Sequence, residues 1–273
     1  MASPLVVLTD FYAVTNRALS YAAGLAVPLK AELVLLHARH GELLAPTGVA
    51  SHHEPNNERA TVRALYALAD DQPVSTEVDI ADNELPEAVH TAVRRHNPLL
   101  LVLGHPGGAD TPVEIMTSTA MNLLRHVPYP LLLVPAPSWE AFPPRRLLLA
   151  LDGEPFTLLP HQDVLRQLLR VANGTLAVVR VTDDSHAFLG AETVLRTVAA
   201  NDLTAELPAR QLYEVYNQSV VGGVLAEAAR QDADLLVVVA RRHSLLGSLF
   251  HRSVTAQLIE RSSIPVLVLP AED

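Results

Sequence analysis

The residues of this chain best suited to chemistry are the glycines of a short polar loop between two apolar runs. The runs are Leu99–Leu103 and Leu131–Val134, and the loop begins at Gly104. Both runs lack polar alternation, as expected for parallel strands that are buried on two faces. A glycine loop that opens onto a helix start presents free backbone N–H groups and the positive end of the helix dipole, which suits a phosphate. The spacing therefore predicts a strand, a glycine loop, a helix start near Thr117–Ala120 and a second strand.

The same series of elements occurs twice in the chain. The segment Leu5–Asp10 matches Leu147–Asp152, and Pro130–Pro135 matches Pro265–Pro270. We predict two copies of one domain, at 1–137 and 145–273, joined by a proline-rich linker.

The two copies are expected to differ in the glycine loop. Gly104 aligns with Ala240 at an offset of 136, whereas Ser118 aligns with Ser253 at an offset of 135. On this alignment the second loop is expected to be one residue shorter than the first.

Within each copy, apolar runs alternate with segments of helical periodicity. This order of β-α-β-α-β-α-β-α-β predicts an α/β fold with two tandem Rossmann-like domains, each a five-stranded parallel sheet with helices on both faces. Strands near Val74–Ile80 and Glu206–Val215 are expected at sheet edges, the second because of Pro208.

Composition excludes several classes of function. A net charge of −10 argues against a nucleic-acid binder, which would need a basic stripe. The absence of cysteine excludes disulfides, thiol catalysis and cysteine-ligated metals. We find no signal-peptide pattern and no apolar run long enough to span a bilayer, so a cytoplasmic protein is expected.

Each half of the chain resembles a universal stress protein domain, and the whole is similar to tandem members of that family. The resemblance rests on the strand that ends in Asp10 or Asp152, on Leu35–His37, and on the terminal strand-loop-helix-strand of each half. It covers nearly the whole chain. It implies that an adenine nucleotide such as ATP binds at the glycine loop, and that the last strands of the two halves pair antiparallel as an internal pseudo-dimer.

Nucleotide-binding members of the family carry G-x2-G-x9-G-(S/T) in this loop. The first half has Gly104 and Gly107 at the right spacing, then Thr117–Ser118, so it departs from the pattern only where Thr117 replaces glycine. A β-branched residue disfavours the backbone conformation that glycine permits there. A Thr117→Gly change is therefore expected to strengthen nucleotide binding.

The second half has lost the loop glycines. Ala240 and His243 stand at their places, and Arg252 precedes Ser253. An imidazole at His243 would obstruct a phosphate. Nucleotide is therefore expected in the first half alone, where the resemblance implies that Asp10 contacts the adenine or ribose and that Gly104, Gly107, Thr117, Ser118 and Thr119 surround the phosphates.

Simpler interpretations compete with these roles. Asp10 could cap the first helix, Ser253 could be an ordinary N-cap, and the two loop glycines could form only a turn. The segment His52–Glu54 lacks a third metal ligand at a recognisable spacing, and Arg241–Arg242 is expected in a solvated loop.

No set of nucleophile, base and orienting residue is visible, so an enzyme is not expected. The sequence thus predicts a stress-response regulator that binds an adenine nucleotide without an evident catalytic set. The alternative is an interaction module that binds no nucleotide. In both cases further association into a homo-oligomer is expected.

Overall fold

The computed structural model describes most of the chain. The described residues are 3–9, 13–38, 55–104, 113–135, 142–158, 163–182, 191–201, 203, 212–241 and 253–272.

The first half alternates strands and helices as predicted. Its elements are β1 (Leu5–Leu8), α1 (Ala13–Leu29), β2 (Leu33–Ala38), α2 (Pro55–Asp70), β3 (Thr76–Ala81), α3 (Leu85–His96), β4 (Leu100–Gly104), α4 (Val113–His126) and β5 (Leu131–Val134).

The second half repeats the alternation and adds a two-residue strand, β7. Its elements are β6 (Arg146–Leu151), β7 (Thr157–Leu158), α5 (Val164–Ala172), β8 (Thr175–Thr182), α6 (Ala191–Ala200), β9 (Leu212–Tyr216), α7 (Val220–Arg230), β10 (Leu235–Arg241), α9 (Val254–Arg261) and β11 (Val266–Glu272).

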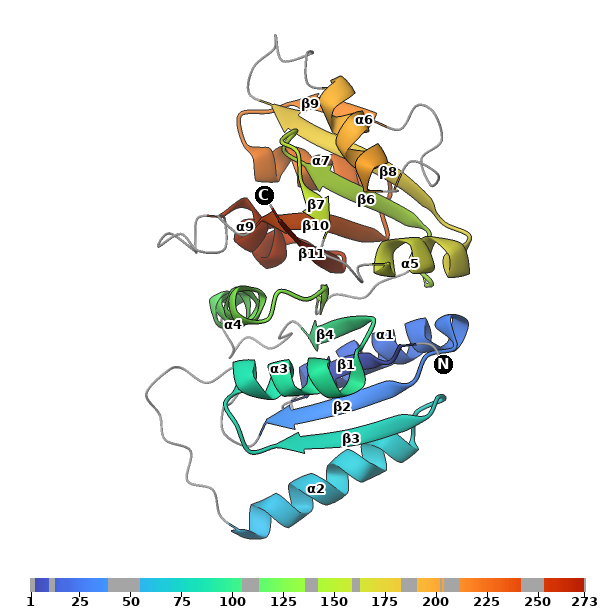
Figure 1. The fold of residues 1–273 in the computed structure, drawn as a ribbon, viewed down its shortest axis with the longest axis vertical. Helices are drawn as coiled ribbons and strands as arrows, with labels where there is room; N and C mark the ends of the chain where they lie inside the picture. Colours follow the sequence, from blue (N-terminus) through green and yellow to red (C-terminus); the bar gives the residue numbers. More distant parts are fainter. Residues whose placement is uncertain are drawn as a thin grey trace.

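All strands join in one 11-stranded sheet that runs through both halves (Figure 1). The order is β3-β2-β1-β4-β5-β11-β10-β6-β8-β9, with β7 paired to β11. Strands β3 and β9 lie at the two ends of this order, which confirms the two predicted edge strands. Pairing within each half is parallel apart from the contact of β7 with β11.

The halves are joined by antiparallel pairing of β5 with β11. Leu132 lies opposite Leu267, and Val266 lies opposite Leu133. A free apolar strand edge would invite pairing with another chain. Along these residues, β5 and β11 each have a strand on both sides, so neither presents such an edge. The predicted antiparallel pairing of the last strands is confirmed.

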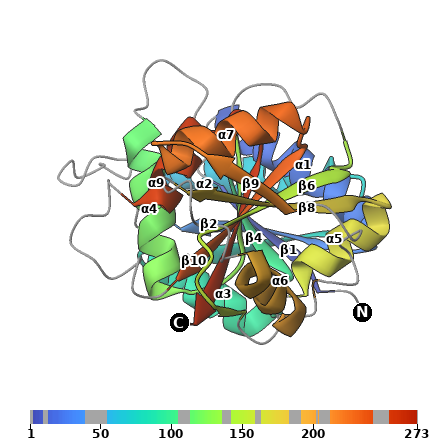
Figure 2. The same ribbon diagram turned by 90° about the horizontal axis from the view of Figure 1, so that it is seen from above.

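Two hydrophobic cores cover opposite faces of the sheet, and each contains residues from both halves. One core collects buried residues from α1, α5 and α6 and from alternate strand positions such as Leu5 and Leu147. The other collects those from α3, α4, α7 and α9 and the intervening positions such as Val6 and Leu148. Figure 2 shows α4 and α9 side by side, and the two helices are in contact. The two halves are thus joined by packing on both faces as well as by the strand pair.

Two element boundaries differ from what the sequence pattern predicts. A proline favours the end of a helix, so the sequence predicts that the first helix ends at Pro28, but Pro28 lies inside the last turn of α1, which ends one residue later at Leu29. The sequence also predicts a helix from Leu158, but Leu158 belongs to β7 and the helix starts at Val164. Strand β9 is described from Leu212; its predicted start at Glu206 lies outside the described residues and stays a prediction.

Asp234 ties the start of β10 to the start of β6. Its carboxylate accepts hydrogen bonds from the backbone N–H groups of Arg145 and Arg146 and from the Arg146 side chain, each at 2.9 Å. Burial raises the pKa of the Asp234 carboxyl, but these hydrogen bonds outweigh burial and hold the pKa below its ordinary value.

We expect Asp234→Ala to destabilise the fold by about 1–3 kcal/mol at neutral pH, because it leaves two backbone donors without their acceptor. The pKa of Asp234 is lower in the folded protein than in the unfolded chain, where it is about 4. The stabilisation by its carboxylate is therefore fully present above about pH 4 and is lost as the pH falls through the pKa of the folded protein. Urea unfolding of both proteins at pH 7 and pH 3 measures the difference, which should shrink at the lower pH. An equal difference at both pH values would contradict the role of the ionised carboxylate.

Candidate functional site

Each half has one place where the order of its strands reverses. In the first half this switch point lies between β1 and β4, and in the second half between β6 and β10. Ligands of open α/β sheets bind in the crevice at the carboxyl ends of such strands. The two switch points are therefore the candidate sites, and they can be compared directly.

In the first half, Gly104 and the end of β1 form the described part of this crevice. Val7 is paired with Val102, so continuing the register sets Thr9 beside Gly104, the last residue of β4. Thr9 is buried, and the ring Nδ1 of His37 lies 3.2 Å from its carbonyl oxygen. Asp10 and Gly107, two of the predicted site residues, lie outside the described residues.

The helix that follows the glycine loop begins earlier than predicted. Helix α4 starts at Val113, so Thr117, Ser118 and Thr119 lie beyond its first turn. Backbone N–H groups at these positions donate to carbonyls four residues earlier in the helix and are not free for a phosphate. The N–H groups that have no carbonyl partner within α4 belong to the residues around Val113.

The side chains of these three residues differ in exposure. Thr117 is buried, Ser118 is exposed and Thr119 is half-buried. A glycine at position 117 would lie inside a helix, where it costs about 1 kcal/mol relative to alanine. The expectation that Thr117→Gly strengthens binding depended on a helix start at this residue, which the structure does not have.

The corresponding helix of the second half starts where the sequence predicted. Helix α9 begins at Val254, and the Ser253 hydroxyl accepts a hydrogen bond from the Ala256 backbone N–H at 3.0 Å. Ser253 is therefore an N-cap, which satisfies one of the free N–H groups of the helix.

Strand pairing corrects the alignment of the two loops. Leu5 is paired with Leu100, and Leu147 with Leu235. Pairing of β4 with β5 and of β10 with β11 gives the same relation, so Gly104 corresponds to Val239 rather than to Ala240. The segments from there to Ser118 and Ser253 are then equal in length, and the prediction that the second loop is one residue shorter is wrong.

At the second switch point, an ion pair joins the ends of the two strands. Arg241, the last residue of β10, donates from Nη2 to Asp152 Oδ1 at 2.6 Å and to the Glu154 carbonyl at 2.7 Å. The Arg241 side chain is 10% exposed. Arg241 was predicted in a solvated loop, but it is the last residue of β10 and is buried, and its side chain bonds to the segment that follows β6. By the corrected alignment, Pro106 stands at this position of the first half.

The segment after β6 covers the same end of the sheet. It turns at Gly153, whose φ of +97° favours glycine, and reaches β7, which pairs with the end of β11. Asn201, the residue after α6, holds this segment: its side chain accepts from the Leu158 N–H at 2.8 Å and donates to the Phe156 carbonyl at 3.0 Å. In this half the segment after β6 and the Arg241 side chain both lie at the carboxyl ends of the strands.

Reasoning from the sequence missed Arg241 and β7. The available signal was that Asp152 and Arg241 each come at the end of an apolar run and that the two runs belong to neighbouring strands. Opposite charges at adjacent strand ends indicate an ion pair. A two-residue strand such as β7 is too short to carry a periodic signal.

Other candidate sites receive no support. In the described part of the chain, no three His, Asp or Glu side chains are grouped as metal ligands, and no helix is long and apolar enough to cross a membrane. The segment His52–Glu54 and residues Arg242, His243 and His251 lie outside the described residues.

Comparison with known proteins identifies the family. The model of the universal stress protein family matches residues 1–135 and 144–270. No curated protein matches the chain. A universal stress protein from Archaeoglobus fulgidus DSM 4304 is similar in structure, with 15% identity over 100% of this chain and 97% of that chain and a TM-score of 0.67.

Two further solved structures share the fold. A functionally unknown protein from Pseudomonas aeruginosa PAO1 is 16% identical over 99% of this chain and 93% of its own, with a TM-score of 0.58. The cytoplasmic domain of a prokaryotic cation chloride cotransporter is 11% identical over 98% of this chain and 95% of its own, with a TM-score of 0.53. The family model matches both halves and nearly all of the sequence, and the chain therefore belongs to the universal stress protein family.

Proposed function

We propose that this stress-response protein is a regulator that binds one ATP or related adenine nucleotide in its first half, without an evident catalytic set. The observation that supports this best is the contrast between the two switch points. Gly104 ends β4 beside Thr9, whereas the corresponding crevice of the second half holds the Arg241–Asp152 ion pair. The second half thus places its own charged side chains where the described part of the first half has only Thr9 and Gly104, which supports a ligand in the first half.

The chemistry of the first switch point suits a nucleotide. Gly104 brings backbone without a side chain to the crevice, and the sequence continues with Gly107 and Gly108. Helix α4 follows, and its N-terminus at Val113 supplies N–H groups that have no partner within the helix and the positive end of a dipole. In this proposal the phosphates are held by the loop and by this helix start, and Asp10 contacts the adenine or ribose.

The position of α4 favours a second candidate, an interaction module that binds no nucleotide. Ser118 and Thr119 carry the hydroxyls that the family resemblance assigns to the phosphates, but they lie in the second turn of the helix. If residues 105–112 do not bring a phosphate to the start of α4, the switch point of the first half has no anion donors.

The two candidate functions are distinguished by testing whether the purified protein carries an adenine nucleotide. The protein is denatured by heat, and the supernatant is analysed by ion-exchange chromatography. The proposal expects an adenine nucleotide in the supernatant, or binding of ATP by the nucleotide-free protein in a calorimetric titration. If the supernatant holds no nucleotide and ATP gives no binding signal, the interaction module is the better account.

A further inference from the structure

Helix α2 carries an exposed stripe at the outer end of the first half, where it packs against β3, an edge strand (Figure 1). Leu65 and Ala69 face the protein and are buried. A solvent-facing side of the helix carries Arg59, Arg63, Tyr66 and Asp70, all exposed. Their spacing of four, three and four residues places them in one line along three turns.

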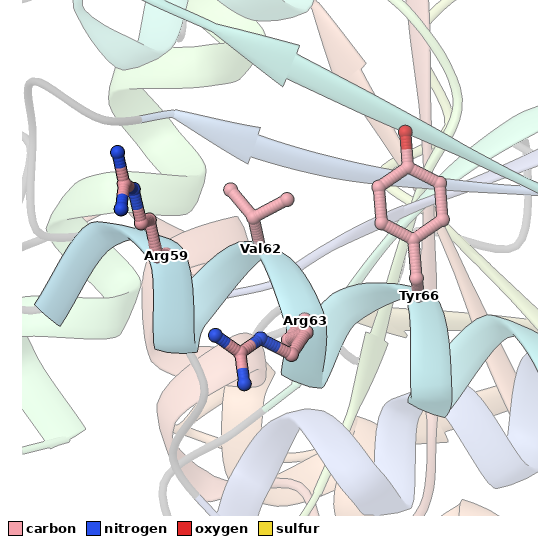
Figure 3. A pocket seen from close by; sticks show the side chains of 4 residues that line it. All are labelled: Arg59, Val62, Arg63 and Tyr66. Atoms are coloured by element: carbon pink, nitrogen blue, oxygen red, sulfur yellow. The ribbon is translucent and has the colours of Figure 1, made fainter. Parts of the chain in front are cut away.

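This surface is shaped for another helix rather than for a small molecule. A groove of about 510 Å³ is lined by Arg59, Val62, Arg63 and Tyr66, all from α2. Figure 3 shows Arg59, Val62 and Tyr66 extending above the helix in that view and Arg63 lying across its front. Side chains from one convex helix flank a ligand without enclosing it, whereas small-molecule sites bury most of the ligand surface.

Apolar and small residues dominate the surface around the stripe. Tyr66 is 53% exposed, and Ala60, Ala64 and Ala67 are exposed as well. Small residues allow a second helix to approach closely. Exposed aromatic residues of this kind are enriched at protein–protein interfaces.

The charges of the stripe are arranged so that it complements itself. Arg59 and Arg63 lie toward the N-terminal end, and Asp70 is the last residue of the helix. In the described part of the chain none of the three has an ion-pair partner. In an antiparallel pair of α2 helices, Arg59 of each copy would face Asp70 of the other, and Arg63 would face Tyr66.

The helix dipole favours the same arrangement. Asp70 lies at the negative end of α2, and no basic residue occupies the last turn. A carboxylate there is destabilising, and a cation brought by a second copy would offset it. An arginine over an aromatic ring adds a cation–π contact.

We propose that the α2 stripe, Arg59, Arg63, Tyr66 and Asp70, is the docking surface for a second copy of this chain. The two copies meet about a twofold axis, with their α2 helices antiparallel and the axis between Arg63 and Tyr66. Such an isologous contact uses the same surface twice. The pairing uses neither switch point and is independent of nucleotide binding.

Charge reversal tests the pairing, because each single variant should lose dimerisation and the double variant should regain it. The full-length parent, Arg59→Asp, Asp70→Arg and the double variant are compared by sedimentation velocity without added nucleotide. We expect the parent to dimerise, each single variant to dimerise about tenfold or more weakly, and the double variant to regain dimerisation. An equimolar mixture of the two single variants should also form dimers, because each copy then supplies the charge that the other lacks.

Arg261→Asp is the matched control, since Arg261 lies in the last turn of α9 in the other half and undergoes the same change of charge. It should dimerise like the parent. Circular dichroism confirms that each variant is folded. A monomeric parent, single variants that dimerise like the parent, or a double variant that stays dissociated would each overturn the proposal.

Discussion

Gly107→Val is expected to abolish the binding of adenine nucleotide, with a loss of affinity on the order of 100-fold or more, or about 3 kcal/mol. Gly107 lies outside the described residues, and the expectation comes from its place in the loop that follows Gly104. Valine puts a branched side chain where backbone must approach a phosphate and disfavours the backbone conformations that glycine permits. Calorimetric titration with ATP measures the loss.

Arg242→Val is the matched control for this variant, because the strand pairing aligns Arg242 with Gly107. It places the same side chain in the corresponding loop of the second half and should leave ATP binding unchanged. Binding that survives Gly107→Val, or that is lost in Arg242→Val instead, would place the nucleotide elsewhere.

Leu267→Asp is expected to unfold the whole chain, not the second half alone. Leu267 is fully buried in β11, lies opposite Leu132 of β5, and belongs to a core shared by both halves. An aspartate there buries a carboxylate without a partner, which costs at least about 4 kcal/mol, a large share of the stability of an ordinary domain. Circular dichroism and urea unfolding should show loss of structure in both halves together.

Val220→Asp provides the comparison for this substitution. Val220 is 40% exposed at the first position of α7, where an acidic residue suits the helix dipole, so its effect should stay within about 0.5 kcal/mol. A first half that remains folded in Leu267→Asp would contradict the shared cores and indicate two independent domains.

The arrangement of strands could be predicted because it depends on signals that occur along whole elements. Apolar runs without alternation, such as Leu131–Val134, identify buried parallel strands wherever they occur. The duplication then offered the related half as a partner for the last strand, and the family resemblance implied the antiparallel pairing of β5 with β11. The cores on both faces of the sheet bury these same apolar runs, so the main architecture could be predicted from the sequence.

The details of the site depend on single residues and were harder to predict. Three hydroxyl residues at Thr117–Thr119 indicated a helix start, but Pro112 and Glu114 are equally good start signals and the helix begins at Val113. Arg241 could not be placed by periodicity, because its burial comes from a partner 89 residues away in the chain.

The most direct test of the account is a comparison of Asp10→Ala with Asp152→Ala in a calorimetric titration with ATP. These residues follow the first strand of each half; Asp152 is paired with Arg241, and Asp10 lies outside the described residues. We predict one ATP per parent chain, an affinity that is roughly 10–100-fold weaker in Asp10→Ala because a buried hydrogen bond is lost, and no change in Asp152→Ala. Two ATP molecules per chain, or a loss of affinity in Asp152→Ala with none in Asp10→Ala, would contradict the assignment of the nucleotide to the first half.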